Sequence, residues 1–282
     1  MNSPLLVFTT DFGLSDPYAG VMKGVALTIN PGLRLIDLTH QVLPQNIAQG
    51  SFLLGINHRY FPKDAIHVAV VDPGVGTDRR PVLLSTPWGR FVAPDNGLLS
   101  GVIAGYLDPT PVVAGPVTLP PELTSVHLTN SEYWRHPVSK TFHGRDVFTP
   151  VAAHLSLGVA PEEIGDAVHS LFYLPLPQPV IQGGKITGQV VYRDVFGNLV
   201  TNIPTESLPS AEAVEVWIKG RSIIGLSQTF NDEWDEDHEA GARLIALAGS
   251  HGYLEVAMSN GNAAALLEAG EGEAVEVVSK SG

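Results

Sequence analysis

One short stretch combines a carboxylate with two guanidinium groups, at Asp72, Arg79 and Arg80. Residues 68–71 are apolar and mostly β-branched, which predicts a buried strand, whereas one proline and two glycines in 73–76 exclude regular structure after it. Charged groups at a strand's end are well placed to bind a ligand, because the loops there converge on one crevice. The alternative is an ordinary loop in which Asp72 caps a turn and both arginines are solvated.

A histidine, His143, comes shortly before a segment with a helical apolar pattern. Val147, Val151 and Leu155 predict one buried face of a helix that begins at Asp146. The dipole of such a helix disfavours the cationic form of an imidazole near its N-terminus, which suits a neutral hydrogen-bonding group. The alternative is a histidine that only completes the capping turn.

Polar side chains also gather in the second half of the chain. Asp194, Asn198 and Asn202 supply donors and acceptors able to bind a nucleobase or an amino-acid head group, although their default interpretation is a plain turn. A further polar segment, 250–254, precedes an expected strand. The acidic run 231–239 is typical of a solvated loop.

The elements that position the N-terminal residues alternate between strand and helix. Such alternation predicts a mostly parallel sheet covered by helices, with Asp11 and Asp72 both at its carboxyl edge. The first helix has Asp16 as its expected N-cap, followed by Pro17. We expect strands at 5–8, 34–39 and 65–71. We expect the first helix to end at about residue 30 and a second helix at 47–60. A hairpin at 81–93, a short helix at 98–105 and an irregular segment at 108–140 should follow.

The chain changes character near residue 173. Alternating prolines and a glycine pair in 173–184 predict an extended linker. Short strand-like runs at about ten-residue spacing follow, which is typical of a small β-barrel. We therefore expect an N-terminal α/β domain at 1–172, the linker at 173–184 and a C-terminal all-β barrel at 185–282.

Composition narrows the functional classes. The 282 residues carry a formal net charge of −13, so nucleic acid is not an expected partner, and the charge mildly favours a cationic ligand. No apolar run approaches membrane length, so no membrane partner is expected. The sequence has no cysteine and no recognisable secretory leader, which together favour a cytoplasmic protein.

Six motifs in order resemble one family, the S-adenosyl-L-methionine (SAM) hydroxide adenosyltransferases, which are related to fluorinases and chlorinases. The resemblance spans nearly the whole chain. The motifs are Thr-Thr-Asp-Phe-Gly at 9–13, Val-Asp-Pro-Gly-Val-Gly-Thr-Asp-Arg-Arg at 71–80, Ala-Pro-Asp-Asn-Gly at 93–97, Thr-Phe-His-Gly-Arg-Asp at 141–146, Asp-Val-Phe-Gly-Asn at 194–198 and Ser-His-Gly-Tyr-Leu at 250–254.

This resemblance implies an α/β domain, a β-barrel domain and a homotrimer with sites between one subunit's N-terminal domain and its neighbour's C-terminal domain. It implies SAM as substrate, with no metal and no cofactor. The catalytic set implied is Asp72, Arg79 and His143. The implied substrate-binding residues are Asp11, which would bind the ribose, together with Asp16, Asp194, Asn198, Ser250 and Tyr253.

The implied reaction is attack of water on the ribose C5′ of SAM, which releases adenosine and L-methionine. Alignment of the nucleophile alone contributes roughly 7–11 kcal/mol to such a step. We expect Asp72 and a neutral His143 to accept protons of the water, while Arg79 favours its hydroxide character. Two alternatives stay open at this point: a halide in place of water, and a sensor that binds SAM or adenosine without turnover.

Overall fold

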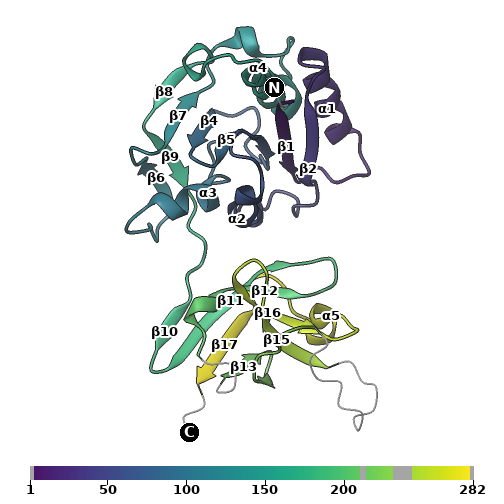
Figure 1. The fold of residues 1–282 in the computed structure, drawn as a ribbon, viewed down its shortest axis with the longest axis vertical. Coiled ribbons are helices and arrows are strands. Elements are labelled where there is room, and N and C mark those ends of the chain that lie inside the picture. Colours follow the sequence, from purple (N-terminus) through teal and green to yellow (C-terminus); the bar gives the residue numbers. More distant parts are fainter. Residues whose placement is uncertain (1–2, 210–213, 231–242, 280–282) are drawn as a thin grey trace. The chain divides into compact units, whose positions relative to one another are not determined.

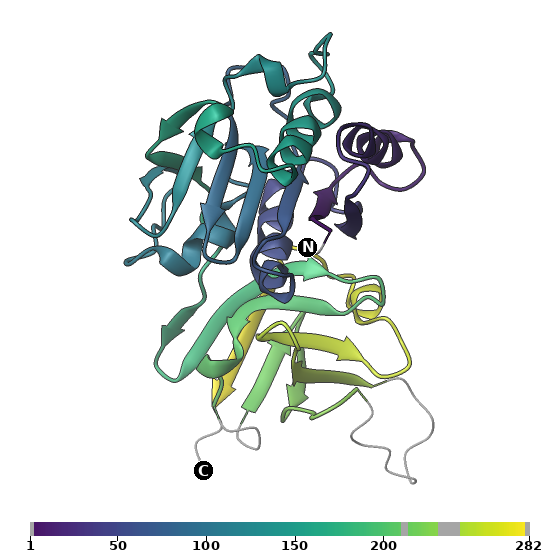
Figure 2. The ribbon, with the colours of Figure 1, turned by 45° about the horizontal axis from the view of Figure 1, so that its top comes forward.

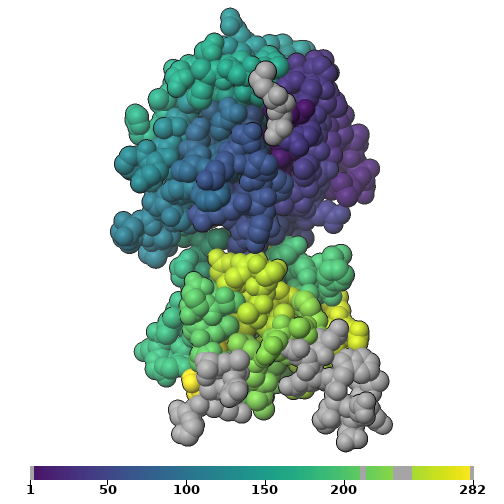
Figure 3. All heavy atoms as spheres, viewed as in Figure 1, coloured from purple at the N-terminus to yellow at the C-terminus, as the bar shows by residue number. Residues whose placement is uncertain are grey.

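The computed structural model describes residues 3–209, 214–230 and 243–279. The chain forms two compact units, Met1–Pro175 and Leu176–Gly282 (Figure 1). Each unit has its own hydrophobic core. Side chains fill the spaces between the ribbons of each unit, as the space-filling view in Figure 3 shows.

The N-terminal unit is built on a seven-stranded sheet of order β2-β1-β3-β5-β4-β7-β8. The strands β2, β1, β3 and β5 are parallel neighbours, as the alternation of elements predicts, and the other three extend the sheet in antiparallel fashion. The strands are β1 (Leu5–Thr10), β2 (Arg34–Thr39), β3 (Ile66–Val70), β4 (Pro81–Thr86), β5 (Gly89–Pro94), β7 (Thr124–His127) and β8 (Asp166–Val168).

Helices cover both faces of this sheet. On one face α1 (Tyr18–Ile29) packs beside α4 (Thr149–Ser156), and their apolar residues form one core with alternate residues of β1 and β3. Elsewhere α2 (Ile47–Asn57) lies beside the short α3 (Ser100–Ile103), as Figures 1 and 2 show. A Cβ atom at Gly55 would lie 2.9 Å from the Cα of Gly101, so glycine is what lets these two helices approach closely.

Two expectations for this unit are wrong in detail. Helix α1 begins at Tyr18 with Pro17 in the N-cap position and without a side-chain cap, so Asp16 does not cap it. The segment 108–140 is not wholly irregular, since it supplies β7 to the main sheet and β6 (Gly115–Thr118) to a two-stranded pair with β9 (Ser170–Tyr173). Such short strands depend on partners distant in sequence, and four residues carry too little periodicity to reveal them.

The C-terminal unit is an antiparallel, nearly closed barrel, as expected. Its sheet has the order β14-β13-β17-β11-β12-β16-β15, with β10 paired to β11. Its core consists mainly of valine, isoleucine, leucine and alanine side chains. The elements are β10 (Val180–Gln182), β11 (Lys185–Arg193), β12 (Leu199–Pro204), β13 (Val214–Ile218), β14 (Arg221–Ile224), β15 (Leu244–Ala248), β16 (Tyr253–Met258), α5 (Ala263–Leu267) and β17 (Ala274–Ser279).

Part of the expected linker belongs to this barrel. Gly183 and Gly184, both with positive φ, form the turn that joins β10 to β11. The acidic run 231–239 lies outside the described residues. Among the residues that the structure does describe, none forms a helix long and apolar enough to cross a membrane.

Candidate active site

Asp72 and Arg79 form a bidentate ion pair at the carboxyl end of β3. The Nε of Arg79 donates to both carboxylate oxygens, at 3.0 and 2.9 Å, and its Nη2 donates to Oδ2 as well. Only 4% of the Asp72 side chain and 9% of the Arg79 side chain is exposed. Two parallel N–H···O bonds fix the relative orientation of these groups, which a single contact does not.

His143 extends this pair into a chain of three groups. The Nη2 of Arg79 lies 2.8 Å from Nδ1 of His143. A guanidinium has only donors, so Nδ1 must accept and the proton of the neutral imidazole must lie on Nε2. The guanidinium of Arg79 also lies over the ring of Phe148, with Cζ 5.2 Å from the ring centroid. Arg79 therefore determines the tautomer of His143.

The pKa of His143 is lowered from its ordinary value by burial and by the neighbouring positive charge of Arg79, while Asp72 and Asp146 oppose this shift. The direction agrees with the expectation from sequence, but the main causes are burial and a cation. The helical segment also begins earlier than expected, with a π-helical turn, Gly144–Phe148, that continues into α4. The imidazole is thus held neutral near pH 7.

The backbone brings the segment 72–80 and the segment around His143 together. Gly76 has φ +78°, and a Cβ atom there would collide with the carbonyl oxygen of Lys140. Beyond Lys140, the fully buried carboxylate of Asp146 accepts from Arg145 at 2.7 Å and from the backbone N–H of Ser139 at 2.9 Å. These contacts stiffen the segment on either side of His143.

Asp11 lies at the same edge of the sheet as Asp72. Thr10 is paired with Val70 in the parallel register of β1 and β3, so both carboxylates follow neighbouring strand ends, as predicted. The Oδ2 of Asp11 accepts from the backbone N–H of Gln45 at 2.7 Å. Asp16, by contrast, is exposed and stands in the loop before α1.

In the C-terminal unit, Asp194 organises a tight turn. Its Oδ1 accepts from the backbone N–H groups of Phe196 at 2.9 Å and Asn198 at 2.8 Å, and its Oδ2 accepts from the side-chain amide of Asn198 at 2.8 Å. Val195 and Phe196 at the tip are 88% and 71% exposed. The sequence interpretation overlooked these two apolar residues, although an aromatic residue in a turn is itself a signal of binding.

Ser250 and Tyr253 lie on the barrel away from the turn that Asp194 organises. Ser250 is exposed in the turn before β16, and Tyr253 is the first residue of that strand. Burial, and to a lesser extent Glu206, raises the pKa of Tyr253. In the β12–β16 ladder Leu199 pairs with Val256 and Pro204 with Tyr253. The 194–198 turn and the 250–253 turn therefore lie at opposite ends of this ladder.

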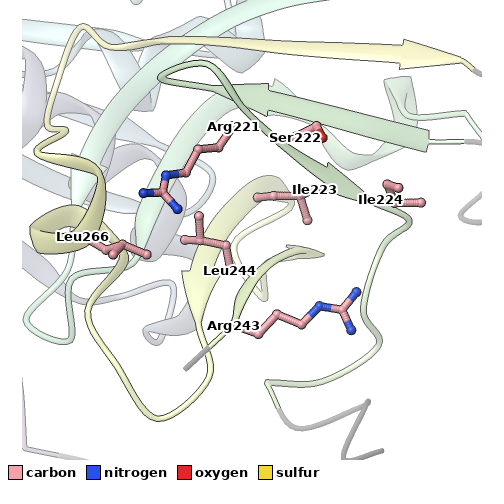
Figure 4. Close-up of a pocket in the computed structure, with 7 residues that line it drawn as sticks. All are labelled: Arg221, Ser222, Ile223, Ile224, Arg243, Leu244 and Leu266. Carbon is pink, nitrogen blue, oxygen red and sulfur yellow. The ribbon is translucent and has the colours of Figure 1, made fainter. Parts of the chain in front are cut away.

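A pocket of about 480 Å³ in the C-terminal unit contains none of the residues singled out from the sequence. Figure 4 shows Arg221 and Arg243 around side chains that are mainly apolar. Its lining residues are Arg221, Ser222, Ile223, Ile224, Arg243, Leu244 and Leu266. It has neither a carboxylate nor an imidazole, so the catalytic chemistry is better sought at the Asp72 edge.

Comparisons with known proteins agree with these motifs. The model described as "SAM hydroxide adenosyltransferase N-terminal domain" matches residues 6–165, and that described as "SAM hydroxide adenosyltransferase C-terminal domain" matches residues 188–276. The chain is 36% identical over 280 residues to the (R)-S-adenosyl-L-methionine hydrolase of Salinispora tropica, with 98% of each chain covered. It is 38% identical over 271 residues to the hydrolase of the same name from Thermus thermophilus, covering 96% of this chain and 98% of that relative.

A solved structure has the same fold. An uncharacterized conserved protein from Thermotoga maritima superposes with a TM-score of 0.83 at 34% identity, and the match covers 97% of this chain and 99% of that one.

Proposed function

Because the chain belongs to the SAM hydroxide adenosyltransferase family, we propose that it is an enzyme that hydrolyses SAM to adenosine and L-methionine. The observation that carries the mechanism is the hydrogen-bonded chain from the buried Asp72 through Arg79 to the half-buried His143. We propose that these three side chains provide the polar groups that act on the attacking water, and that no cofactor takes part, since SAM itself is the substrate.

We infer different roles for the three groups from these hydrogen bonds. Nδ1 of His143 is occupied by Arg79, so the Nε2–H donates to the oxygen of the attacking water and orients it. The carboxylate of Asp72 has lone pairs beyond those that Arg79 uses, and it accepts the proton of the water. This revises the expectation that both Asp72 and His143 accept protons.

The bond changes balance without a further reagent. The water oxygen attacks C5′, the C5′–S bond breaks, and its electron pair returns to sulfur, which leaves as the neutral thioether of L-methionine. The proton of the water passes to Asp72 and then to solvent. A sulfonium is already a good leaving group, so positioning of the water provides most of the catalysis, roughly 7–11 kcal/mol in favourable cases. Asp11 would accept the ribose hydroxyls and fix the line of attack.

The C-terminal residues would bind the two ends of the substrate. Phe196 offers an exposed aromatic face for an adenine ring, next to Asn198. Ser250 and Tyr253 lie at the other end of the β12–β16 ladder, where the three-residue step from Val256 to Tyr253 alone spans about 10 Å. This spacing suits an elongated ligand with a nucleoside at one end and an amino acid at the other.

We propose that these C-terminal residues complete a neighbour's site in a homotrimer. Mixed oligomers of Asp72→Asn and Asn198→Ala subunits should then recover activity that neither variant has alone, because some interfaces would join two intact halves. Subunit exchange is verified by mass spectrometry of differently tagged chains. Mixtures that exchange and stay inactive would place each site within one chain.

The direct test of the function is incubation with SAM, followed by chromatography of the products in buffers with and without chloride or fluoride. We expect adenosine and L-methionine in equal amounts under all conditions. The buried carboxylate of Asp72 would repel a halide at the position of the water. A 5′-halo product would support the halide alternative, and SAM recovered intact would support a sensor.

A further inference from the structure

Asn96, which follows β5, is bonded to the start of the segment that carries Asp72 and Arg79. The Nδ2 of Asn96 donates to the carbonyl oxygen of Val71 at 2.9 Å. That carbonyl belongs to the peptide that precedes Asp72, so its orientation sets the direction in which Asp72 leaves β3. The Oδ1 of Asn96 accepts from the backbone N–H of Leu98 at 3.1 Å, which fixes the amide itself.

The neighbouring Asp95 is bonded to the end of the same segment. Its Oδ2 accepts from Nε of Arg80 at 2.9 Å, and its backbone N–H donates to the carbonyl of Arg80 at 2.8 Å. Its Oδ1 accepts from the backbone N–H of Phe172 at 2.7 Å, so the carboxylate, 6% exposed, is tied to β9 as well. Arg80 donates in turn to the carbonyl of Ser170 at 2.9 Å.

Between these two points the segment has little regular structure of its own. Its backbone hydrogen bonds are those of turns, from Val75 to Asp72 at 3.2 Å and from Thr77 to Gly74 at 3.1 Å. Residues 73–76 contain one proline and two glycines. The geometry of the segment is therefore determined largely by the places where its ends are held.

We propose that Asp95 and Asn96 are positioning residues, which hold the segment 72–80 at both ends and so keep Asp72 and Arg79 aligned on the attacking water. This inference rests on the proposed function. A displacement of about 1 Å is enough to cost on the order of 10²-fold in rate when catalysis depends on alignment. Loss of the Asn96–Val71 bond should therefore lower kcat and leave KM for SAM nearly unchanged.

The substitution Asn96→Asp isolates this bond. It keeps the Oδ1 acceptor for Leu98, removes the donor to Val71 and places a carboxylate oxygen against a carbonyl. The chain offers a matched control in Asn130, whose Oδ1 accepts from the backbone N–H of Glu132 at 3.1 Å and whose Nδ2 donates to the carbonyl of Glu163 at 2.8 Å. Asn130→Asp thus makes the same chemical change outside the segment 72–80.

Two readouts separate positioning from general stability. The first is steady-state kinetics, where we expect kcat to fall on the order of 10²-fold in Asn96→Asp and to stay within about twofold of the parent in Asn130→Asp. The second is the titration of the His143 ring by NMR of histidine-labelled protein without substrate. Arg79, Asp72 and Asp146 are the charged groups that act on this ring. Displacement of Arg79 should raise the pKa of His143 in Asn96→Asp, whereas the pKa in Asn130→Asp should equal that of the parent.

The outcomes are distinguishable from failure of the proposed function. If the parent does not hydrolyse SAM, the ring titration still reports whether Asn96 positions Arg79. Parent-like kcat and parent-like titration in Asn96→Asp would overturn the proposal, as would equal effects of Asn96→Asp and Asn130→Asp. Asn96→Ser provides a second variant without an added charge, since it retains an oxygen for Leu98 but is too short to reach Val71. We expect kcat to fall and the pKa of His143 to rise in this variant as well.

Discussion

The Nη2 of Arg79 lies 2.8 Å from Nδ1 of His143, and this contact leaves the proton of the neutral imidazole on Nε2. In the proposed mechanism His143 is then a donor to the attacking water, and Asp72 alone is its proton acceptor. Such an assignment is testable, because a glutamine amide reproduces an acceptor and a donor on one side chain without a group that titrates.

We predict that His143→Gln retains more activity than His143→Ala, because its amide oxygen is able to accept from Arg79 and its amide nitrogen to donate to water. His143→Ala should lose on the order of 10²-fold in kcat. The parent's rate should fall as pH decreases through a transition below 6.5, since the pKa of His143 is lowered and protonation of Nδ1 breaks the contact with Arg79.

The pH dependence of kcat in the three proteins checks this prediction. His143→Gln should lack the acid-side transition. If glutamine is as damaging as alanine, His143 acts as a base rather than a donor. If the transition persists unchanged in a folded His143→Gln, it belongs to another group.

A second prediction concerns His67, a fully buried residue of β3. Neither of its ring nitrogens has a hydrogen-bond partner among the described residues, and the ring stacks on Phe91 with 4.7 Å between centroids. Burial, with a smaller contribution from His58, lowers its pKa to about 3. The unfolded chain binds a proton at this residue near pH 6.5 and the folded chain does not, so stability is lost as pH falls from 6.5 towards 3.

Between pH 8 and pH 5 this linkage amounts to about 2 kcal/mol of unfolding free energy. We therefore expect urea unfolding of His67→Phe, which keeps the aromatic stack, to lose about 2 kcal/mol less than the parent over that range. His169→Phe, the same substitution at an exposed histidine, is the control and should behave as the parent does. An equal loss in His67→Phe and the parent would contradict a neutral buried His67.

The sequence predicts the elements whose signals are local. Runs of buried apolar residues identify β1 and β3, and their parallel register brings Asp11 and Asp72 to one edge as expected. Asn46 caps α2, accepting from the N–H of Gln49 at 3.0 Å, because its capping pattern lies within a few residues.

Features that depend on distant partners could not be predicted. The contact between Arg79 and His143 joins residues 64 positions apart and decides the tautomer, yet no local pattern encodes it. The same holds for β7, whose four residues form a strand only through pairing with the distant strands β4 and β8. Asn96 is typical of a turn, and the sequence around it does not reveal that its amide donates to the distant carbonyl of Val71.

A third prediction tests the close approach of Gly76, in the segment 72–80, to Lys140, in the segment before His143. In Gly76→Ala the methyl group would collide with the carbonyl of Lys140 and the backbone would keep φ near +78°. Gly220 is a matched control, since its φ is +71° but a Cβ there meets nothing within 4 Å. Both alanine variants should lose about 1–3 kcal/mol of stability from backbone strain. Only Gly76→Ala should also lose kcat, and parent-like kcat in that variant would show that the segments tolerate separation.

The last prediction concerns the charge of Asp72. Asp72→Asn preserves the shape of the side chain and removes the proton acceptor, so turnover should nearly vanish, while the Kd for SAM, measured by calorimetry, should stay within about tenfold. Because a neutral amide no longer repels an anion, the variant should also form a 5′-chloro product at high chloride, detected by chromatography and mass spectrometry. Unchanged hydrolysis would remove Asp72 from the mechanism. Loss of hydrolysis without any chlorinated product would mean that features other than the carboxylate exclude halide from the water's position.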